Sequence, residues 1–164
     1  MTDLADEITV KPEIMFLEGV LSELASGKLR VPKFQRPFVW RPEQMLDLFD
    51  SIERGYPIGS LLVWDTNQQV SSLERIADIE VPSAPLGRQV SYLLDGHQRL
   101  STLFGSLSRR PPAEPGAGQQ EWMWDIYRVL GGHAEPGNRY RHWKKVDRPS
   151  ADLDPNRSKQ LILV

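Results

Sequence analysis

The sequence predicts a mixed α/β or α+β domain. Apolar residues recur at helical spacing in three segments, apolar runs of strand length lie between and after them, and the predicted order is helix, loop, helix, strand, strand, helix, strand. The chain has 164 residues, which is enough for one domain with a substantial core and short for two. We therefore treat residues 1–164 as a single domain.

The first part of the chain is predicted to hold two helices joined by an extended loop. Residues 13–26 carry apolar side chains at every third or fourth position. Pro32 and Pro37 exclude a helix from residues 29–40. Residues 41–55 form the clearest helical pattern. Its apolar face consists of Met45, Leu48, Phe49 and Ile52.

The second part alternates strands with one helix. Residues 58–64 are predicted to form a buried strand, residues 90–95 a second strand and residues 97–108 a helix. A polar, turn-rich excursion, residues 65–88, separates the two strands, and residues 121–130 read as a further strand. The well-patterned core is therefore expected over about residues 14–130.

The remaining segments lack a clear pattern. Three prolines and two glycines make residues 109–120 a loop, and residues 131–164 read as a polar extension. The chain stops on the apolar run Leu-Ile-Leu-Val, whereas chain ends usually fray in solvent. We therefore expect an N-terminal fragment of a larger protein, whose C-terminal part is missing.

Composition bounds the function. A net charge of −2 gives no overall electrostatic case for nucleic-acid binding. The absence of cysteine excludes disulfides, thiolate metal sites and cysteine catalysis, and it suits a cytoplasmic protein. No run approaches the roughly 18 apolar residues of a membrane span. We expect a cytoplasmic protein with no membrane partner.

The most informative stretch is the predicted strand-to-helix junction at residues 95–99, Asp-Gly-His-Gln-Arg. A helix start leaves backbone N–H groups unpaired, and its dipole favours an anion such as phosphate. Gly96 lets a ligand approach the backbone, and Arg99 could clamp a phosphate. Asp95 could hold Mg²⁺ or orient water, and His97 could act as acid or base. The alternative is that Asp95 caps the helix and the next three residues form a solvated first turn.

A second polar cluster lies in residues 34–41. Gln35, Arg36 and Arg41 stand among three aromatic residues, which is typical of a ligand-facing surface. The Gln-Arg pair recurs at residues 98–99 and suggests two arms around one anion. The alternative has the aromatic residues as core anchors with Arg36 stacked on one of them.

Three further features are weaker. His133 and His142 lie in the polar tail with no second ligand at metal spacing, so we read them as surface residues. The basic stretch RYRHWKK at residues 139–145 could touch nucleic acid, although a solvated loop is the favoured interpretation. No P-loop sequence is present, so any nucleotide site is of another kind.

Three motifs together resemble one family. They stand in order at residues 32–40 (PKFQRPFVW), residues 51–59 (SIERGYPIG) and residues 95–99 (DGHQR). This pattern resembles the N-terminal domain of GmrSD-type, modification-dependent restriction enzymes, over about residues 14–130. The resemblance implies an α+β, ParB/sulfiredoxin-like fold with a mixed sheet flanked by helices. One residue departs from the family signature Asp-Gly-Gln-Gln-Arg, because His97 replaces the first glutamine.

The resemblance also implies a function. It implies binding and hydrolysis of a nucleoside triphosphate, coupled to recognition or cleavage of modified or foreign DNA in a bacterial anti-phage restriction system. The implied catalytic residues are Asp95, His97 and Arg99, and Asp95 would also bind Mg²⁺. The implied phosphate-binding residues are Gln35, Arg36, Gly96, Gln98, Arg99 and Ser101. The partners would be DNA and a C-terminal nuclease domain, and a homodimer is left open.

Two other functions stay open at this point. The domain could be a ParB-type module that binds DNA or senses its modification without turnover. It could instead be a metal-dependent DNA nuclease, with Asp95 and either Glu43 or Asp47 as metal ligands. A purely structural interaction domain is the remaining alternative.

Overall fold

The computed structural model describes residues 11–84, 87–108, 121–129, 139–142 and 161–163. Its helices are α1 (Leu17–Ala25), α2 (Pro42–Glu53), α3 (His97–Leu107) and the short 3₁₀ helix η1 (Glu121–Trp124). Its strands are β1 (Leu29–Arg30), β2 (Leu62–Thr66), β3 (Arg75–Ile76), β4 (Ile79–Glu80), β5 (Val90–Asp95), β6 (Ile126–Val129), β7 (Tyr140–His142) and β8 (Leu161–Leu163).

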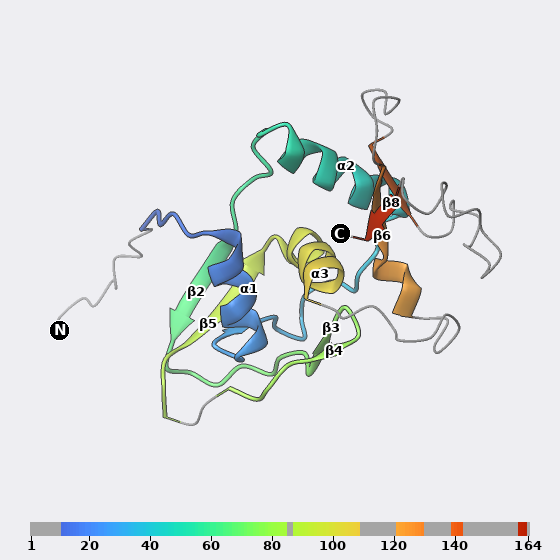
Figure 1. The fold of residues 1–164 in the computed structure, drawn as a ribbon. Coiled ribbons are helices and arrows are strands. Elements are labelled where there is room, and N and C mark those ends of the chain that lie inside the picture. The colour runs from blue at the N-terminus through green and yellow to red at the C-terminus, as the bar shows by residue number, and fades with distance from the viewer. Residues whose placement is uncertain (1–10, 85–86, 109–120, 130–138, 143–160, 164) are drawn as a thin grey trace, which may run out of the picture.

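The described strands form three small sheets. In the first, β5 is central, with β1 parallel to it on one side and β2 antiparallel on the other. The second is the hairpin β3–β4, and in the third β6 pairs antiparallel with both β7 and β8. Helices and a mixed sheet therefore occur together, which confirms the expected α+β class. Figure 1 shows α3 between the first sheet and the elements that follow it in the chain.

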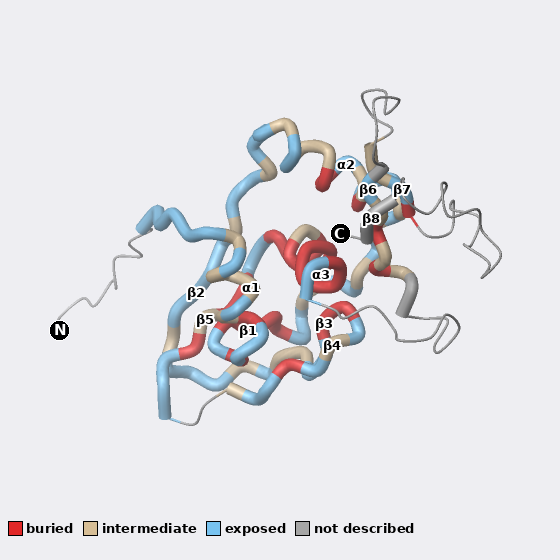
Figure 2. Tube along the Cα trace, viewed as in Figure 1, coloured by how far each residue is buried: buried red, intermediate tan, exposed pale blue. Residues whose placement is uncertain are grey.

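The core forms around α3 and β5. Nearly the whole of α3 is buried, as Figure 2 shows, and Tyr92 and Leu93 of β5 are fully buried. Helix α2 turns Met45, Leu48 and Phe49 inward, as its pattern predicts, because these residues lie three or four positions apart. Among the described residues, no helix is long and apolar enough to cross a membrane.

The start of α1 differs from the sequence expectation. The helix begins at Leu17 rather than near residue 13. Ile14 and Phe16 are exposed to solvent, so the apolar repeat continues upstream of the helix without a surface to pack against. Phe16 is the N-cap and has an extended backbone. Helical spacing alone therefore placed this boundary too early, because tertiary burial selects the helical residues.

The strand expected at residues 58–64 is also shifted and was wrongly expected to be buried. The strand is β2 (Leu62–Thr66), and its residues are largely exposed. Two carbonyl groups before it, those of Ile58 and Ser60, accept hydrogen bonds from Arg99 and so do not join the sheet. Strand β2 lies at the edge of its sheet, with β5 as its neighbour.

The later part of the chain also differs in detail. The strand expected over residues 121–130 begins as η1 and becomes extended only at Ile126. The excursion at residues 65–88 contains the hairpin β3–β4. The polar extension contributes β7 and β8, whose short runs gave no clear strand pattern. The loop expected at residues 109–120 lies outside the described residues.

Candidate functional site

The site begins at the turn from β5 into α3. Gly96 is the N-cap of α3 and adopts a left-handed backbone with φ of +99°. A β-carbon at this position would collide with a methyl group of Leu61. Both the backbone angle and the close approach therefore require glycine here.

The N-terminus of α3 has no side-chain cap. The first bond within the helix is donated by the Leu100 N–H to the Gly96 carbonyl, at 2.9 Å. The N–H groups of the three preceding residues have no partner inside the helix, and they lie at the positive end of its dipole. Asp95 therefore does not cap the helix, which corrects the simpler alternative for this junction.

The solvated first turn in that alternative is wrong as well, since His97 and Gln98 are buried. Nδ1 of His97 lies 3.1 Å from the Arg36 carbonyl. A carbonyl only accepts, so Nδ1 carries the proton and Nε2 of the neutral ring is left as an acceptor. Burial lowers the pKa of His97, and the nearby charge of Arg36 lowers it further, while the hydrogen bond opposes both. The ring therefore favours its neutral form.

Gln98 ties the loop before α2 to α3. Its Oε1 accepts from the N–H groups of Val39 and Trp40, at 2.8 and 3.2 Å. Its Nε2 donates to the carbonyl of Pro37 at 3.0 Å. The buried amide is thus surrounded by backbone partners. Its predicted contact with phosphate stays a prediction, and its observed contacts hold the loop in place.

Gln35 acts on the same loop from the other side. Its Nε2 donates to the carbonyls of Leu93 and Leu94, at 3.2 and 2.9 Å. These carbonyls lie at the end of β5, just before the Asp95–Gly96 turn. The two glutamines therefore fasten residues 35–40 to both sides of the turn. The sequence identified these residues but assigned them to the ligand rather than to the loop.

Arg99 is bound partly to the protein. Its Nη1 donates to the Ile58 carbonyl at 2.5 Å and its Nη2 to the Ser60 carbonyl at 2.8 Å. Its Nη2 also lies 3.4 Å from Oδ2 of Asp95. Gly59 has φ of +85°, and a β-carbon there would collide with the guanidinium. Sequence reasoning missed this role of Gly59, although the glycine ends one of the three motifs.

The remaining predicted residues differ in accessibility. Arg36 is exposed, and its side chain has no hydrogen-bond partner among the described residues. The Asp95 side chain is 74 % exposed, against 19 % for Arg99. Ser101 is buried, and its Oγ has no hydrogen-bond partner in the described part of the chain. Arg36 and Asp95 are therefore the predicted residues best placed to meet a ligand from solvent.

Taken together, the structure brings most of the predicted site to one end of α3. The backbone of Arg36 touches His97, and Arg99 touches Asp95. Ser101 lies one turn further along the helix, inside the core. Arg41 lies outside this cluster, where its N–H donates to Oε1 of Gln44 at the start of α2.

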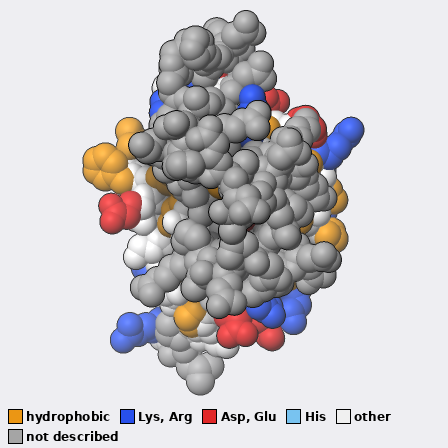
Figure 3. Space-filling view, turned by 45° about the vertical axis from the view of Figure 1, so that its right-hand side comes forward, with side chains coloured by type: hydrophobic (Ala, Val, Ile, Leu, Met, Phe, Trp, Pro, Cys, Tyr) orange, Lys and Arg blue, Asp and Glu red, His pale blue; other side chains and the backbone are white. Residues whose placement is uncertain are grey.

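The structure gives little support to the other candidate sites, namely a metal site, the two histidines of the polar tail and the basic stretch 139–145. No group of three or more potential metal-binding side chains occurs within the described residues. His142 is buried and its Nε2 lies 2.7 Å from the Met123 carbonyl, so the surface position expected for it is wrong. Of the basic stretch 139–145, Arg139 pairs with Glu53 at 3.6 Å. Residues 143–145 and His133 lie outside the described residues. In Figure 3 the basic and acidic side chains of the described residues appear around the margin of the view.

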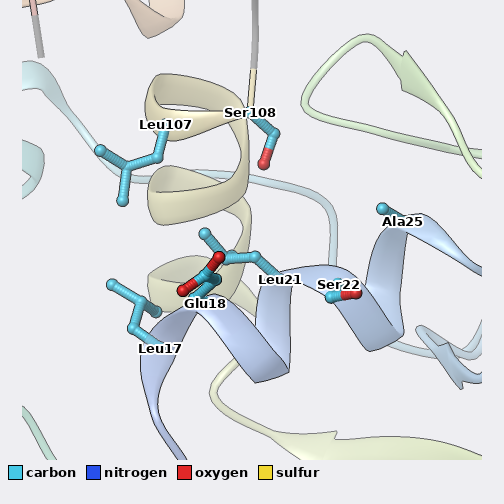
Figure 4. Close-up of a pocket in the computed structure, with 7 residues that line it drawn as sticks. All are labelled: Leu17, Glu18, Leu21, Ser22, Ala25, Leu107 and Ser108. Carbon is cyan, nitrogen blue, oxygen red and sulfur yellow. The ribbon is translucent and has the colours of Figure 1, made fainter.

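Two of the hollows on the described surface lie beside α3. The larger, about 450 Å³, lies between α1 and the C-terminal end of α3, and its walls include Leu17, Leu21 and Leu107 (Figure 4). It is at the opposite end of α3 from Gly96. The smaller, about 250 Å³, lies between α2 and the segment before β2, and Arg99 lines it. The smaller hollow therefore adjoins the candidate site.

Comparisons with known proteins address the family. A family model described as "GmrSD restriction endonuclease, N-terminal domain" matches residues 17–161. The chain is 32 % identical over 92 residues to "Uncharacterized protein MJ0686" of Methanocaldococcus jannaschii. The aligned residues cover 54 % of this chain and 16 % of that protein. The chain thus spans about a sixth of that relative's length. No solved structure matches.

The family match is consistent with the ParB-like fold that the motifs imply. It covers α1 through β7 and the first residue of β8, and so it includes every residue of the candidate site. Because it extends over most of the chain, the protein belongs to the family of GmrSD restriction endonuclease N-terminal domains.

Proposed function

We propose that this domain binds a nucleoside triphosphate at the N-terminus of α3 and hydrolyses it, within a restriction system that acts on modified DNA. One observation carries the proposal. Arg36, whose backbone carbonyl contacts His97, lies with Asp95 and Arg99 at a helix start whose N–H groups have no side-chain cap, in a chain of a restriction-enzyme family. Uncapped N–H groups and arginines are the groups that bind phosphate.

The roles divide by accessibility. Arg36 is the exposed cation that meets the phosphates from solvent. Arg99 offers the guanidinium N–H groups that are not bonded to the carbonyls of Ile58 and Ser60. Gln35 and Gln98 add no charge, and their contacts keep Arg36 beside the helix. Preorganised donors of this kind stabilise the charge that develops in the transition state.

Asp95 is the residue that fits Mg²⁺. Its carboxylate is exposed and stands beside the expected phosphate position, and Mg²⁺ is usually held by one or two carboxylates together with substrate phosphates. The bound ion would neutralise phosphate charge. Asp95 itself either binds that ion or orients the attacking water. The Nε2 acceptor of His97 also lies at the start of α3.

The coupling to DNA lies at the level of the whole protein. The family name gives a restriction endonuclease, and this chain corresponds to its N-terminal domain. We propose that nucleotide state in this domain controls a nuclease domain elsewhere in the protein. Modified DNA would be the target of that nuclease. Location in the cytoplasm and self-association stay predictions.

The test measures phosphate release from ATP, GTP, CTP and UTP by the full-length protein in Mg²⁺. Arg36→Ala and Asp95→Asn should each lower turnover by about 100-fold or more while the melting temperature stays unchanged, because both side chains are exposed. Arg99→Ala is less informative, since it also removes the bonds to Ile58 and Ser60.

Arg88→Ala is the matched control. Arg88 is an exposed arginine that precedes β5, so it is separated from Asp95 by the length of that strand. Turnover should be the same as in the wild-type protein. Wild-type rates in both Arg36→Ala and Asp95→Asn would contradict the proposed site. Salt-dependent DNA binding without any phosphate release would favour the ParB-type alternative instead.

A further inference from the structure

The smaller hollow is lined by aromatic, aliphatic, polar and charged side chains. It lies between α2 and the segment that precedes β2, and its volume is about 250 Å³. Ligand pockets for drug-sized molecules usually measure about 300–1,000 Å³. A whole nucleoside triphosphate would therefore not fit inside it, but part of one would.

One part of its wall is flat and apolar. Trp40 contributes an aromatic ring that is only partly buried, and Leu48 and Ile58 contribute aliphatic surface. Stacking of a nucleobase on an aromatic side chain typically contributes about 1–3 kcal/mol and tolerates every base. The backbone N–H of Trp40 donates to Oε1 of Gln98, which fixes the backbone of this residue beside the hollow.

The other part of the wall is one polar face of α2. Gln44, Asp47 and Ser51 follow at intervals of three and four residues, which places them on one side of the helix. The oxygen of Gln44 already accepts from Arg41, and the hydroxyl of Ser51 donates to the Asp47 carbonyl at 2.7 Å. The Asp47 carboxylate is exposed and has no partner among the described residues. It is the free acceptor of the hollow.

Arg99 joins this hollow to the phosphate site. It lines the hollow, and the same guanidinium lies 3.4 Å from Asp95. The free carboxylate of Asp47 repels phosphate, so the phosphates belong on the Arg99 side and a neutral group on the Asp47 side. The charges therefore orient a nucleotide across the hollow.

We propose that this hollow binds the nucleoside half of the triphosphate, with the base against Trp40 and Asp47 accepting hydrogen bonds from N–H or O–H donors of the nucleoside. The inference rests on the proposed nucleotide site. It adds Asp47 of α2 as a specificity residue, which lies outside the three motifs at residues 32–40, 51–59 and 95–99. The donors are either the edge of a base or the ribose hydroxyls, and the two sources have different signatures.

The experiment measures equilibrium binding, so that it does not depend on hydrolysis. The four ribonucleoside triphosphates, their deoxy forms and inorganic tripolyphosphate are titrated in Mg²⁺ against the full-length protein by calorimetry. Asp47→Asn should weaken binding of the best nucleotide by tenfold or more and leave tripolyphosphate affinity unchanged. Lost discrimination between bases assigns Asp47 to the base edge, and lost discrimination between ribose and deoxyribose assigns it to the hydroxyls.

Glu18→Gln is the control, because Glu18 lines the larger hollow (Figure 4) and undergoes the same chemical change. It should alter no affinity. Three results would overturn the inference: equal wild-type affinity for tripolyphosphate and every nucleotide, no effect of Asp47→Asn, or an equal loss for tripolyphosphate. A modified DNA duplex is titrated in the same way, and a loss of affinity confined to that duplex would also overturn the inference and assign the hollow to a DNA base. Tight nucleotide binding without turnover would instead contradict hydrolysis and leave this inference standing.

Discussion

His97 is a titratable side chain that the fold keeps uncharged. It is buried, its Nδ1–H donates to the Arg36 carbonyl, and burial is the main reason why its pKa is lowered. In the unfolded chain the pKa is about 6.5, so the unfolded state takes up the proton first as pH falls. The contribution of the neutral His97 ring to the free energy of unfolding is therefore complete above about pH 6.5, and it is lost progressively as the pH falls below that value.

This sign gives a prediction for His97→Gln. A glutamine N–H can still donate to the Arg36 carbonyl, but the side chain no longer titrates. The variant should match the wild-type protein near pH 7.5 and become relatively more stable towards pH 5.5, by up to about 1.4 kcal/mol per unit of lowered pKa. Urea unfolding at several pH values measures this difference. A constant difference across that range would contradict it.

The residue scale also shows what the sequence could not provide. Residue types identified the chemistry at positions 95–99, but they did not identify the partners. Gln98 and Arg99 bond to backbone carbonyls and N–H groups that are about 40 to 60 positions away in the chain. Such contacts follow from the tertiary fold. A side chain whose type indicates ligand binding can therefore instead hold two segments of the backbone together.

At the scale of elements, the loop before α2, residues 35–40, is hydrogen-bonded to the first turn of α3. The side-chain amide of Gln98 accepts hydrogen bonds from the N–H groups of Val39 and Trp40 and donates one to the Pro37 carbonyl. One buried amide therefore makes the backbone hydrogen bonds that a neighbouring strand would otherwise make. Pro37 lies within this loop and excludes a helix there. The position of the loop, and with it the position of Arg36, depends on the Gln98 side chain.

Gln98→Ala should therefore be among the most destabilising polar substitutions. It leaves two N–H groups and one carbonyl without their partner in a partly buried place, which we expect to cost about 2–4 kcal/mol. The denaturant midpoint should fall with an unchanged slope. Gln68→Ala, the same change at an exposed position, should stay within about 0.5 kcal/mol of the wild-type protein. Equal denaturant midpoints for both variants would contradict the conclusion that Gln98 holds residues 35–40 against α3.

Elements were predicted best where local periodicity and burial agree. The limits of α2, β5 and α3 lie within two residues of the expected ones, since each has a clear apolar face or run. Strand β2 was displaced because the residues before it serve Arg99 rather than the sheet. Strands β1, β3 and β4 are two residues long, which is too short for any periodicity to reveal.

At the scale of the whole molecule, α3 connects parts that do not pair with one another. Its first turn carries the candidate site, and its later turns contact β3 and η1. Gly105 marks the closest of these contacts: a β-carbon there would lie 2.6 Å from that of Ala77 and 2.7 Å from the ring of Trp124. The hairpin and η1 therefore approach the helix only because this position has no side chain.

Gly105→Ala tests whether this approach matters to the entire fold. Alanine favours a helix by about 1 kcal/mol, but overpacking a tight contact typically costs about 1–3 kcal/mol. Because Ala77 and Trp124 are both buried, the neighbours cannot move aside easily, and we expect a net loss of about 1–2 kcal/mol in the free energy of unfolding.

Gly19→Ala makes the same change in α1 with a different neighbour. Its β-carbon would meet only Met15, a flexible and partly exposed side chain, at 3.2 Å. The gain in helix propensity should then dominate, so this variant should equal or exceed wild-type stability by up to about 1 kcal/mol. Thermal and urea unfolding measure both variants. Opposite signs for the two glycines are expected, whereas a gain at both positions would mean that the surroundings of α3 yield as readily as the exposed surface of α1.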